Sequence, residues 1–167
     1  MCRVITGASF LKVEIDNQKK IESFAVDLAK LCKTGDILGL NGRLGIGKTT
    51  FARAFINAIG SSLGHATETV PSPTYTLIQV YSFGSLEIYH ADLYRLENLD
   101  EIWELGLEDS FHQGITIIEW PDRMGPFLPL STLQIFISPG KRSENRLLEF
   151  YGCSDWKFRL TREKMHG

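Results

Sequence analysis

Long apolar runs are missing from this sequence. No stretch approaches the ~18 apolar residues of a membrane-spanning helix, and the N-terminus has no apolar segment of the signal-peptide kind. Cysteine is scarce as well. Cys2, Cys32 and Cys153 are odd in number and widely spaced, which matches neither a disulfide framework nor a zinc site. These absences predict a soluble, cytoplasmic protein with reduced thiols and no membrane partner.

An excess of positive charge is also absent. The chain has 18 lysines and arginines against 20 aspartates and glutamates, which gives a net charge of −2. Without a basic surface, tight RNA binding by this chain alone is not expected. There are no internal repeats, and 167 residues with 43% apolar content can form one core. We therefore expect a single domain over residues 1–167, with a less ordered tail from about residue 156.

One glycine-rich segment, GRLGIGKT, stands out from the rest of the sequence. It fills every fixed position of the phosphate-binding pattern G-x-x-x-x-G-K-[ST] with Gly42, Gly47, Lys48 and Thr49. Apolar residues before it predict a buried strand, and those after it recur at helical spacing up to Gly60, where a helix would stop. The strand residues are Ile37, Leu38 and Leu40, and the helix residues are Phe51, Ala52, Phe55, Ile56 and Ile59. A chance glycine-rich turn does not explain this strand–loop–helix context.

The chemistry of such a loop is binding of a nucleoside triphosphate. Glycines let backbone N–H groups converge on phosphate oxygens, and the helix N-terminus adds partial positive charge. Lys48 is expected to reach the β- and γ-phosphates, and the Thr49 hydroxyl to bind the bridging Mg²⁺. Thr50 supports the α-phosphate side in this interpretation. The sequence therefore predicts ATP and Mg²⁺ as cofactors.

The order of the predicted elements departs from a simple alternation of strand and helix. A hairpin is predicted from residues 74–83 and 85–94, joined across Gly84 and Ser85. The remaining predicted elements are a strand over 9–15, a helix capped by Asp16 or Asn17, an acidic helix over 99–111, a strand over 114–120, and a strand pair over 132–138 and 146–152. The expected fold is α/β, of the P-loop NTPase type. It has a mixed sheet with a parallel nucleotide-binding part, antiparallel edge strands, and helices on both faces.

Two acids follow apolar strands, where the functional crevice of an open α/β sheet lies. Asp92 ends LEIYHAD, and Glu119 ends GITIIE. Asp92 is either a carboxylate that holds Mg²⁺ through water or a turn aspartate. A buried Glu119 must be paired or bound to metal. His90 is either a proton carrier beside Asp92 or a hydrogen-bonded structural histidine. Trp120 either stacks on a partner or covers the nucleotide, or it is an edge residue of the core, which is the commoner place for a tryptophan at a strand end.

Four segments resemble the bacterial TsaE (YjeE) family in order and spacing: GRLGIGKTT, SPTYTL, YHADLYRL and IEWPDRMGPFLP. The similarity runs from Asp16 to Ser138. It implies an ATPase that serves N6-threonylcarbamoyladenosine formation at position 37 of tRNA. The implied partners are TsaB and TsaD, with tRNA reached through their complex.

The resemblance also implies site residues. ATP phosphates are expected on Gly45, Ile46, Gly47, Lys48, Thr49 and Thr50, Mg²⁺ on Thr49 and Glu119, and a requirement for Asp92 in hydrolysis. The loop Ser72-Pro73-Thr74-Tyr75 resembles a switch segment near the γ-phosphate; without the resemblance it is equally an ordinary proline turn. The nearest matches to the family's base contacts are Asp16, Asn17 and Ser138.

The P-loop departs from the family pattern Gly-Asp-Leu-Gly-Ala-Gly-Lys-Thr at two positions. Arg43 replaces the aspartate, which reverses a charge beside the phosphates and affects affinity or hydrolysis rate. Ile46 replaces the alanine, and we expect its side chain on the outer side of the loop.

Two other functions stay open. The first is a small-molecule P-loop kinase, which needs a mobile lid with arginines over the phosphates. Residues 96–114 carry no such arginines and are acidic instead. The second is a nucleotide-gated binding module with incidental hydrolysis, which shares every site residue with the ATPase.

Overall fold

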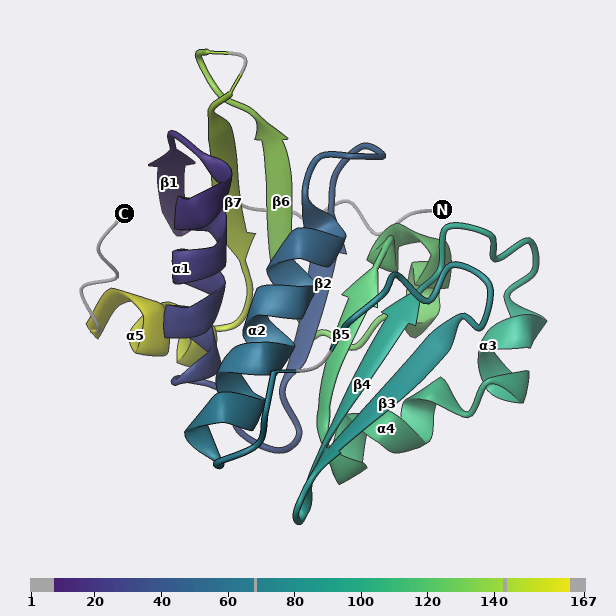
Figure 1. Cartoon of the computed structure of the whole chain (residues 1–167). Helices are drawn as coiled ribbons and strands as arrows, with labels where there is room; N and C mark the ends of the chain where they lie inside the picture. Colours follow the sequence, from purple (N-terminus) through teal and green to yellow (C-terminus); the bar gives the residue numbers. More distant parts are fainter. Residues whose placement is uncertain (1–7, 68, 143, 163–167) are drawn as a thin grey trace.

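The computed structural model describes residues 8–67, 69–142 and 144–162, and it is built around a mixed sheet of seven strands (Figure 1). The strand order is β1-β7-β6-β2-β5-β4-β3. The strands are β1 Leu11–Ile15, β2 Ile37–Asn41, β3 Ile78–Phe83, β4 Leu86–Asp92, β5 Ile115–Glu119, β6 Leu133–Pro139 and β7 Arg146–Tyr151.

The centre of the sheet is parallel and its two edges are antiparallel. Strand β2 pairs in parallel with β5 and β6, and β4 pairs in parallel with β5. Strands β7 and β1 extend one edge antiparallel, and β3 closes the other as a hairpin with β4. All five residues of β2 and of β5 are buried, as expected for strands covered on both faces. The predicted fold class is confirmed, including the hairpin across Gly84 and Ser85.

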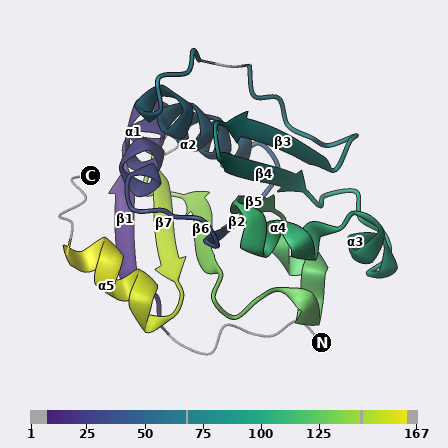
Figure 2. The same ribbon diagram turned by 90° about the horizontal axis from the view of Figure 1, so that it is seen from below.

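Helices cover both faces of the sheet (Figure 2). Helices α1 (Gln18–Ala29) and α2 (Lys48–Ser62) pack side by side on one face. The other face is covered by α3 (Asp100–Glu104), α4 (Leu107–Gln113), the 3₁₀ segment η1 (Pro121–Phe127) and α5 (Ser154–Arg162). Within the described residues, no helix has both the length and the apolar character needed to cross a membrane.

Gly60 does not end helix α2, contrary to the sequence prediction. The helix continues to Ser62, and the positive φ of 82° that follows a helix end belongs to Gly64. Gly60 instead allows close packing, because a Cβ at that position would lie 2.7 Å from the Phe83 ring. A glycine required by tertiary packing has the same sequence signature as a helix stop.

The predicted acidic helix over 99–111 is two short helices. Gly106 adopts a left-handed conformation with φ of 61° and separates α3 from α4. Ile102 of α3 and Leu107 of α4 are both buried in a cluster with Ala91 and Ile118 of the sheet. The break turns two short apolar faces toward the same part of the sheet.

The chain beyond residue 156 is a packed helix through Arg162, which differs from the less ordered tail expected there; residues 163–167 lie outside the described structure. Trp156 and Leu160 are buried in the core, and the Trp156 indole donates to the Ser131 carbonyl over 2.9 Å. Arg159 binds the buried Asp36 carboxylate with both terminal nitrogens, at 2.7 and 2.9 Å. This bidentate pair joins α5 to the chain just before β2.

We expect Asp36→Asn to lower the free energy of unfolding by about 2 to 4 kcal/mol, because it leaves a partly buried guanidinium without its buried partner. Asp155→Asn is the matched control, since Asp155 also pairs with Arg159 but its side chain is 56% exposed. That change should cost less than about 1 kcal/mol. Urea denaturation of the three proteins measures both values. Equal losses in the two variants would contradict the role given to the Asp36 pair.

Candidate nucleotide site

The glycines of the P-loop let the chain pass close to strand β6 and then enter helix α2. Gly42 has a φ of 143°, and a Cβ there would lie 2.5 Å from the Ile137 carbonyl oxygen. Gly47 has a φ of 119° and precedes Lys48, the first residue of α2. Both conformations exclude ordinary side chains without strain. The predicted strand–loop–helix arrangement is present, with the helix N-terminus facing the cavity described below.

Ile46 points into the core and not to the outer side of the loop, so that prediction was wrong. Its side chain is 3% exposed and belongs to the main core cluster with Ile21. A Cβ atom on Gly42 would lie only 2.9 Å from the Cγ2 atom of Ile46. The backbone carbonyl of Ile46 accepts a bond from Arg146 Nε at 3.3 Å. Because the side chain is buried, Ile46 helps to anchor the P-loop to the core.

Lys48 is held inside the loop. Its ammonium donates to the Gly42 carbonyl at 2.7 Å and to the Arg43 carbonyl at 3.0 Å. It also lies 4.0 Å from the centroid of the Trp120 ring. Burial lowers the pKa of Lys48, and the nearby carboxylate of Glu119 partly offsets that effect. The amine therefore sits among acceptors beside a cavity where anions can reach it.

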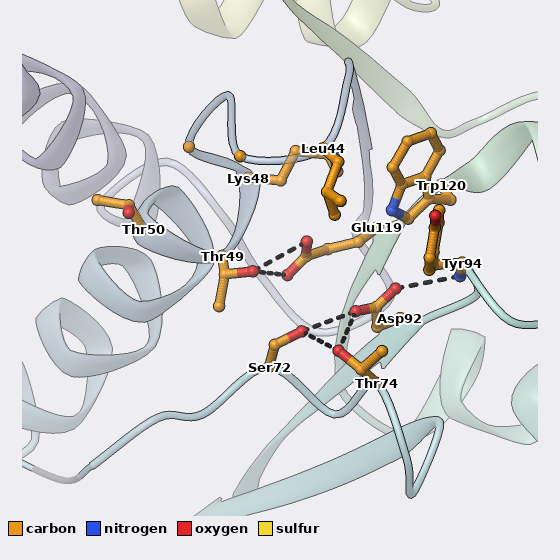
Figure 3. Close-up of a pocket in the computed structure, with 12 residues that line it drawn as sticks. Leu44, Lys48, Thr49, Thr50, Ser72, Thr74, Asp92, Tyr94, Glu119 and Trp120 are labelled. Atoms are coloured by element: carbon orange, nitrogen blue, oxygen red, sulfur yellow. Dashed lines mark hydrogen bonds between the residues drawn. The ribbon is translucent and has the colours of Figure 1, made fainter.

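Thr49 and Glu119 meet across the cavity (Figure 3). The Thr49 hydroxyl lies 2.9 and 3.1 Å from the two carboxylate oxygens of Glu119, which is 2% exposed. His90 Nε2 lies 2.9 Å from Oε1 of the same carboxylate. The alternative of His90 as a proton carrier beside Asp92 is not supported, because its ring nitrogen contacts Glu119.

Asp92 holds the loop that contains Ser72 and Thr74. Its Oδ2 atom accepts bonds from the Ser72 hydroxyl at 2.7 Å and the Thr74 hydroxyl at 3.0 Å, and Oδ1 accepts from the Tyr94 backbone N–H at 3.1 Å (Figure 3). The loop ends at Leu77, which has a strained φ of 62°. Asp92 is thus both a turn aspartate, through the Tyr94 bond, and a side chain of the site.

Together these side chains enclose a cavity of about 190 Å³. Its lining is Leu44, Gly45, Gly47, Lys48, Thr49, Thr50, Ser72, Thr74, Asp92, Tyr94, Glu119 and Trp120. Most of the predicted phosphate, metal and catalytic residues are therefore brought together. Oxygen atoms from Thr49, Glu119 and Asp92 form the hard donor set that suits Mg²⁺.

The predicted base contacts lie outside this lining. Asn17 caps helix α1 by accepting the Lys20 backbone N–H, and Asp16 pairs with the Lys20 ammonium at 2.9 Å. The Ser138 hydroxyl faces the Leu147 carbonyl at 3.5 Å. The role of these three residues at a nucleotide base stays a prediction.

Two aromatic residues line the cavity: Tyr94, which sequence reasoning missed, and Trp120, for which a place over the nucleotide was the less favoured of the alternatives. The Tyr94 and Trp120 rings pack in a tilted arrangement, with 5.1 Å between centroids and 43° between their planes. Trp120 has a left-handed φ of 59° directly after Glu119. The sequence offered one indication of this role: Tyr94 lies two residues after Asp92, and Trp120 lies one residue after Glu119, so each follows a strand-end acid. The side chain of Leu44, 71% exposed, completes the rim.

Comparison with known proteins decides the family. The family model "Threonylcarbamoyl adenosine biosynthesis protein TsaE" matches residues 15–147. The chain belongs to the TsaE family. The Bacillus subtilis strain 168 TsaE protein is 39% identical over 138 residues, which cover 82% of this chain and 83% of that protein. The Rickettsia felis TsaE protein is 40% identical over 151 residues, which cover 84% and 86%.

A solved structure agrees with this assignment. The crystal structure of Bacillus subtilis YdiB aligns with a TM-score of 0.71 at 33% identity, covering 92% of each chain. TsaE membership assigns this protein to the biosynthesis of threonylcarbamoyladenosine in tRNA.

We expect removal of the two hydroxyls that bind Asp92, in a Ser72→Ala and Thr74→Val double variant, to loosen the loop. Each hydrogen bond contributes about 1 kcal/mol net. Amide hydrogen exchange of residues 74–77 should therefore accelerate roughly 5- to 30-fold. Thr69→Val, an exposed hydroxyl of the same connection, is the control and should leave exchange unchanged. Unchanged exchange in the double variant would contradict the anchoring role.

Proposed function

We propose that this protein binds and hydrolyses ATP with Mg²⁺ and acts as a nucleotide switch on the TsaB–TsaD complex during threonylcarbamoyladenosine formation at tRNA position 37. The observation that carries the proposal is the convergence of Lys48, Thr49, Asp92 and Glu119 on one cavity at the N-terminus of α2. A helix N-terminus, a lysine and oxygen ligands are the parts that a triphosphate with its metal requires.

Each side chain has a defined task in this proposal. Lys48 binds the β- and γ-phosphate oxygens, which replace the loop carbonyls that it contacts here. Thr49 and Glu119 hold Mg²⁺, which neutralises charge on the phosphates. Asp92 supports hydrolysis by holding the metal through water or by orienting the attacking water. Gly45, Gly47 and Thr50 supply the phosphate cradle.

The switch is the loop that carries Ser72 and Thr74. Its hydroxyls bind the same carboxylate that the proposal assigns to hydrolysis, so a change at the γ-phosphate alters the contacts that hold the loop. A loop with two sets of contacts changes the surface offered to a partner. ATP then times association with TsaB–TsaD and is not consumed as a substrate of the tRNA modification.

The kinase alternative has less support. A phosphate lid over the cavity needs cations, whereas the segment from residue 97 to 109, which includes α3 and the start of α4, carries Glu97, Asp100, Glu101, Glu104, Glu108 and Asp109. Carboxylates repel a triphosphate. The binding-module alternative uses the same residues as the switch, so turnover that depends on the partners separates the two.

Lys48→Ala should lower steady-state ATP hydrolysis on the order of a hundredfold, since it removes a preorganised cation from the transferring phosphate. The assay uses the protein alone and with TsaB–TsaD and tRNA, while threonylcarbamoyl transfer is followed in parallel. We expect the partners to stimulate wild-type turnover and Lys48→Ala to lose sustained modification.

Lys30→Ala is the matched control, because Lys30 is an exposed lysine that pairs with Asp27 in an i, i+3 bridge and is not part of the cavity lining. It should behave as wild type. Rapid turnover by the isolated protein that TsaB–TsaD leave unchanged would sink the switch proposal.

ATP should change the fluorescence of Trp120. The ammonium of Lys48 lies over the Trp120 ring, and phosphate oxygens compete for that ammonium. We therefore expect an emission change on ATP addition that Trp120→Phe abolishes. Trp103→Phe is the control, since Trp103 packs against Phe127 away from the cavity lining. A signal that survives in Trp120→Phe and disappears in Trp103→Phe would contradict the assignment.

A further inference from the structure

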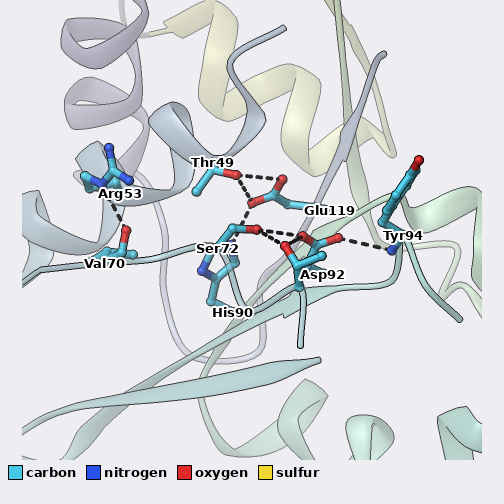
Figure 4. Close-up of polar contacts among 9 residues, drawn as sticks. Thr49, Arg53, Val70, Ser72, His90, Asp92, Tyr94 and Glu119 are labelled. Carbon is cyan, nitrogen blue, oxygen red and sulfur yellow. Dashed lines mark hydrogen bonds and ion pairs between the residues drawn. The ribbon is translucent and has the colours of Figure 1, made fainter. Parts of the chain in front are cut away.

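His90 is a fully buried imidazole beneath the candidate site. It lies on strand β4, between the edge strand β3 and strand β5, opposite Gln79 of β3 and Ile117 of β5 in the sheet register. Its exposed fraction is 0%, and its Nε2 atom lies 2.9 Å from Glu119 Oε1 (Figure 4). The other ring nitrogen, Nδ1, has no hydrogen-bond partner among the described residues. Within the described structure, the polar contact of this ring is therefore directed at one carboxylate oxygen.

Glu119 stands between His90 and Thr49. The imidazole contacts Oε1 from below, and the Thr49 hydroxyl contacts both carboxylate oxygens from helix α2. The contacts link three elements, α2, β5 and β4, through one buried carboxylate. A neutral imidazole with its proton on Nε2 is the form that donates to a carboxylate while it leaves Nδ1 as an acceptor.

We propose that His90 is a positioning residue for the metal ligand Glu119. By donating Nε2–H to Oε1, His90 holds the carboxylate plane and leaves Oε2 directed at the Mg²⁺ of the bound nucleotide. The inference rests on the proposed function, because it requires the Mg²⁺–ATP site. It adds a residue that is not itself part of the cavity lining and acts through its contact with Glu119.

Two physical reasons support this role. Hydrogen bonds behind a metal ligand orient it, and their loss typically lowers metal affinity about ten- to hundredfold. The Thr49 hydroxyl contacts both carboxylate oxygens nearly equally, so it does not select one of them for the metal, whereas His90 contacts Oε1. A role in packing alone predicts a different pattern, in which metal-dependent and metal-independent binding fall together.

His90→Asn and His90→Gln provide a matched pair. The glutamine amide nitrogen reaches the position of Nε2, whereas the asparagine nitrogen reaches only that of Nδ1. Isothermal titration calorimetry of a nonhydrolysable ATP analogue, with Mg²⁺ and with EDTA, separates the two affinities. We expect His90→Asn to weaken Mg²⁺-dependent binding about tenfold or more while binding in EDTA stays within about twofold, and His90→Gln to restore most of the loss.

A second readout does not use affinity. Mn²⁺ in place of Mg²⁺ should give an electron paramagnetic resonance spectrum that changes in His90→Asn and is recovered in His90→Gln. In a Glu119→Ala background, His90→Asn should have no further effect on the metal dependence, because the two residues act as one unit.

The outcomes separate this inference from the proposed function. A wild type that binds nucleotide equally with Mg²⁺ and EDTA contradicts the proposed metal site. A metal-dependent wild type with an unaffected His90→Asn, or with equal losses in Mg²⁺ and EDTA, contradicts the role of His90 alone. If neither variant folds, nitrogen-15 spectra of wild-type histidine decide the matter: a proton on Nε2 in the Mg²⁺–nucleotide complex supports the proposal, and a proton on Nδ1 overturns it.

Discussion

The alignment of the carboxyl ends of β2, β4 and β5 is the constraint on which the rest of the site depends. The register pairs Leu40 with Glu119 and Glu119 with Asp92, so the P-loop and both acids leave the sheet at the same level. Backbone bonds continue this alignment past the strands, from Trp120 N–H to the Leu40 carbonyl and from Leu93 N–H to the Glu119 carbonyl. Because side chains alternate along a strand, a shift of one residue in either pairing would turn a carboxylate to the opposite face.

This arrangement buries polar groups, which costs free energy, and the hydrogen bonds among those groups offset part of the cost. Lys48, His90 and Glu119 are each less than 5% exposed, in a region where unpaired polar atoms are destabilising. Carbonyls of the P-loop satisfy the lysine, while Thr49 and His90 satisfy the glutamate. The strained backbone at Leu77 and Trp120 flanks the same cavity. Such strain persists where surrounding structure holds it, and here it positions the loop and the aromatic wall of the site.

Local patterns explain why much of the fold and site was predictable. The P-loop glycines, the apolar strand before them and the helix after them carry their signals within a few residues, and the strand-end acids follow from alternation and position. The hairpin at Gly84 is equally local. Ile46, Gly60 and the segment from Trp156 to Arg162 were misjudged because their environments come from distant parts of the chain. Ile46 joins the core cluster that also holds Ile21, Gly60 packs against Phe83, and Arg159 pairs with Asp36.

The sequence alone determined the TsaE resemblance, the α/β class with its P-loop, and the identities of Lys48, Thr49, Asp92 and Glu119, since each depends on residue type and spacing. The tertiary structure decided which of these side chains touch, and through which atoms. His90 shows the difference. Its spacing placed it beside Asp92, yet the parallel pairing of β4 with β5 brings its Nε2 to Glu119, 29 residues away. Contacts across a sheet depend on strand order and register, and no local pattern in a single sequence specifies them.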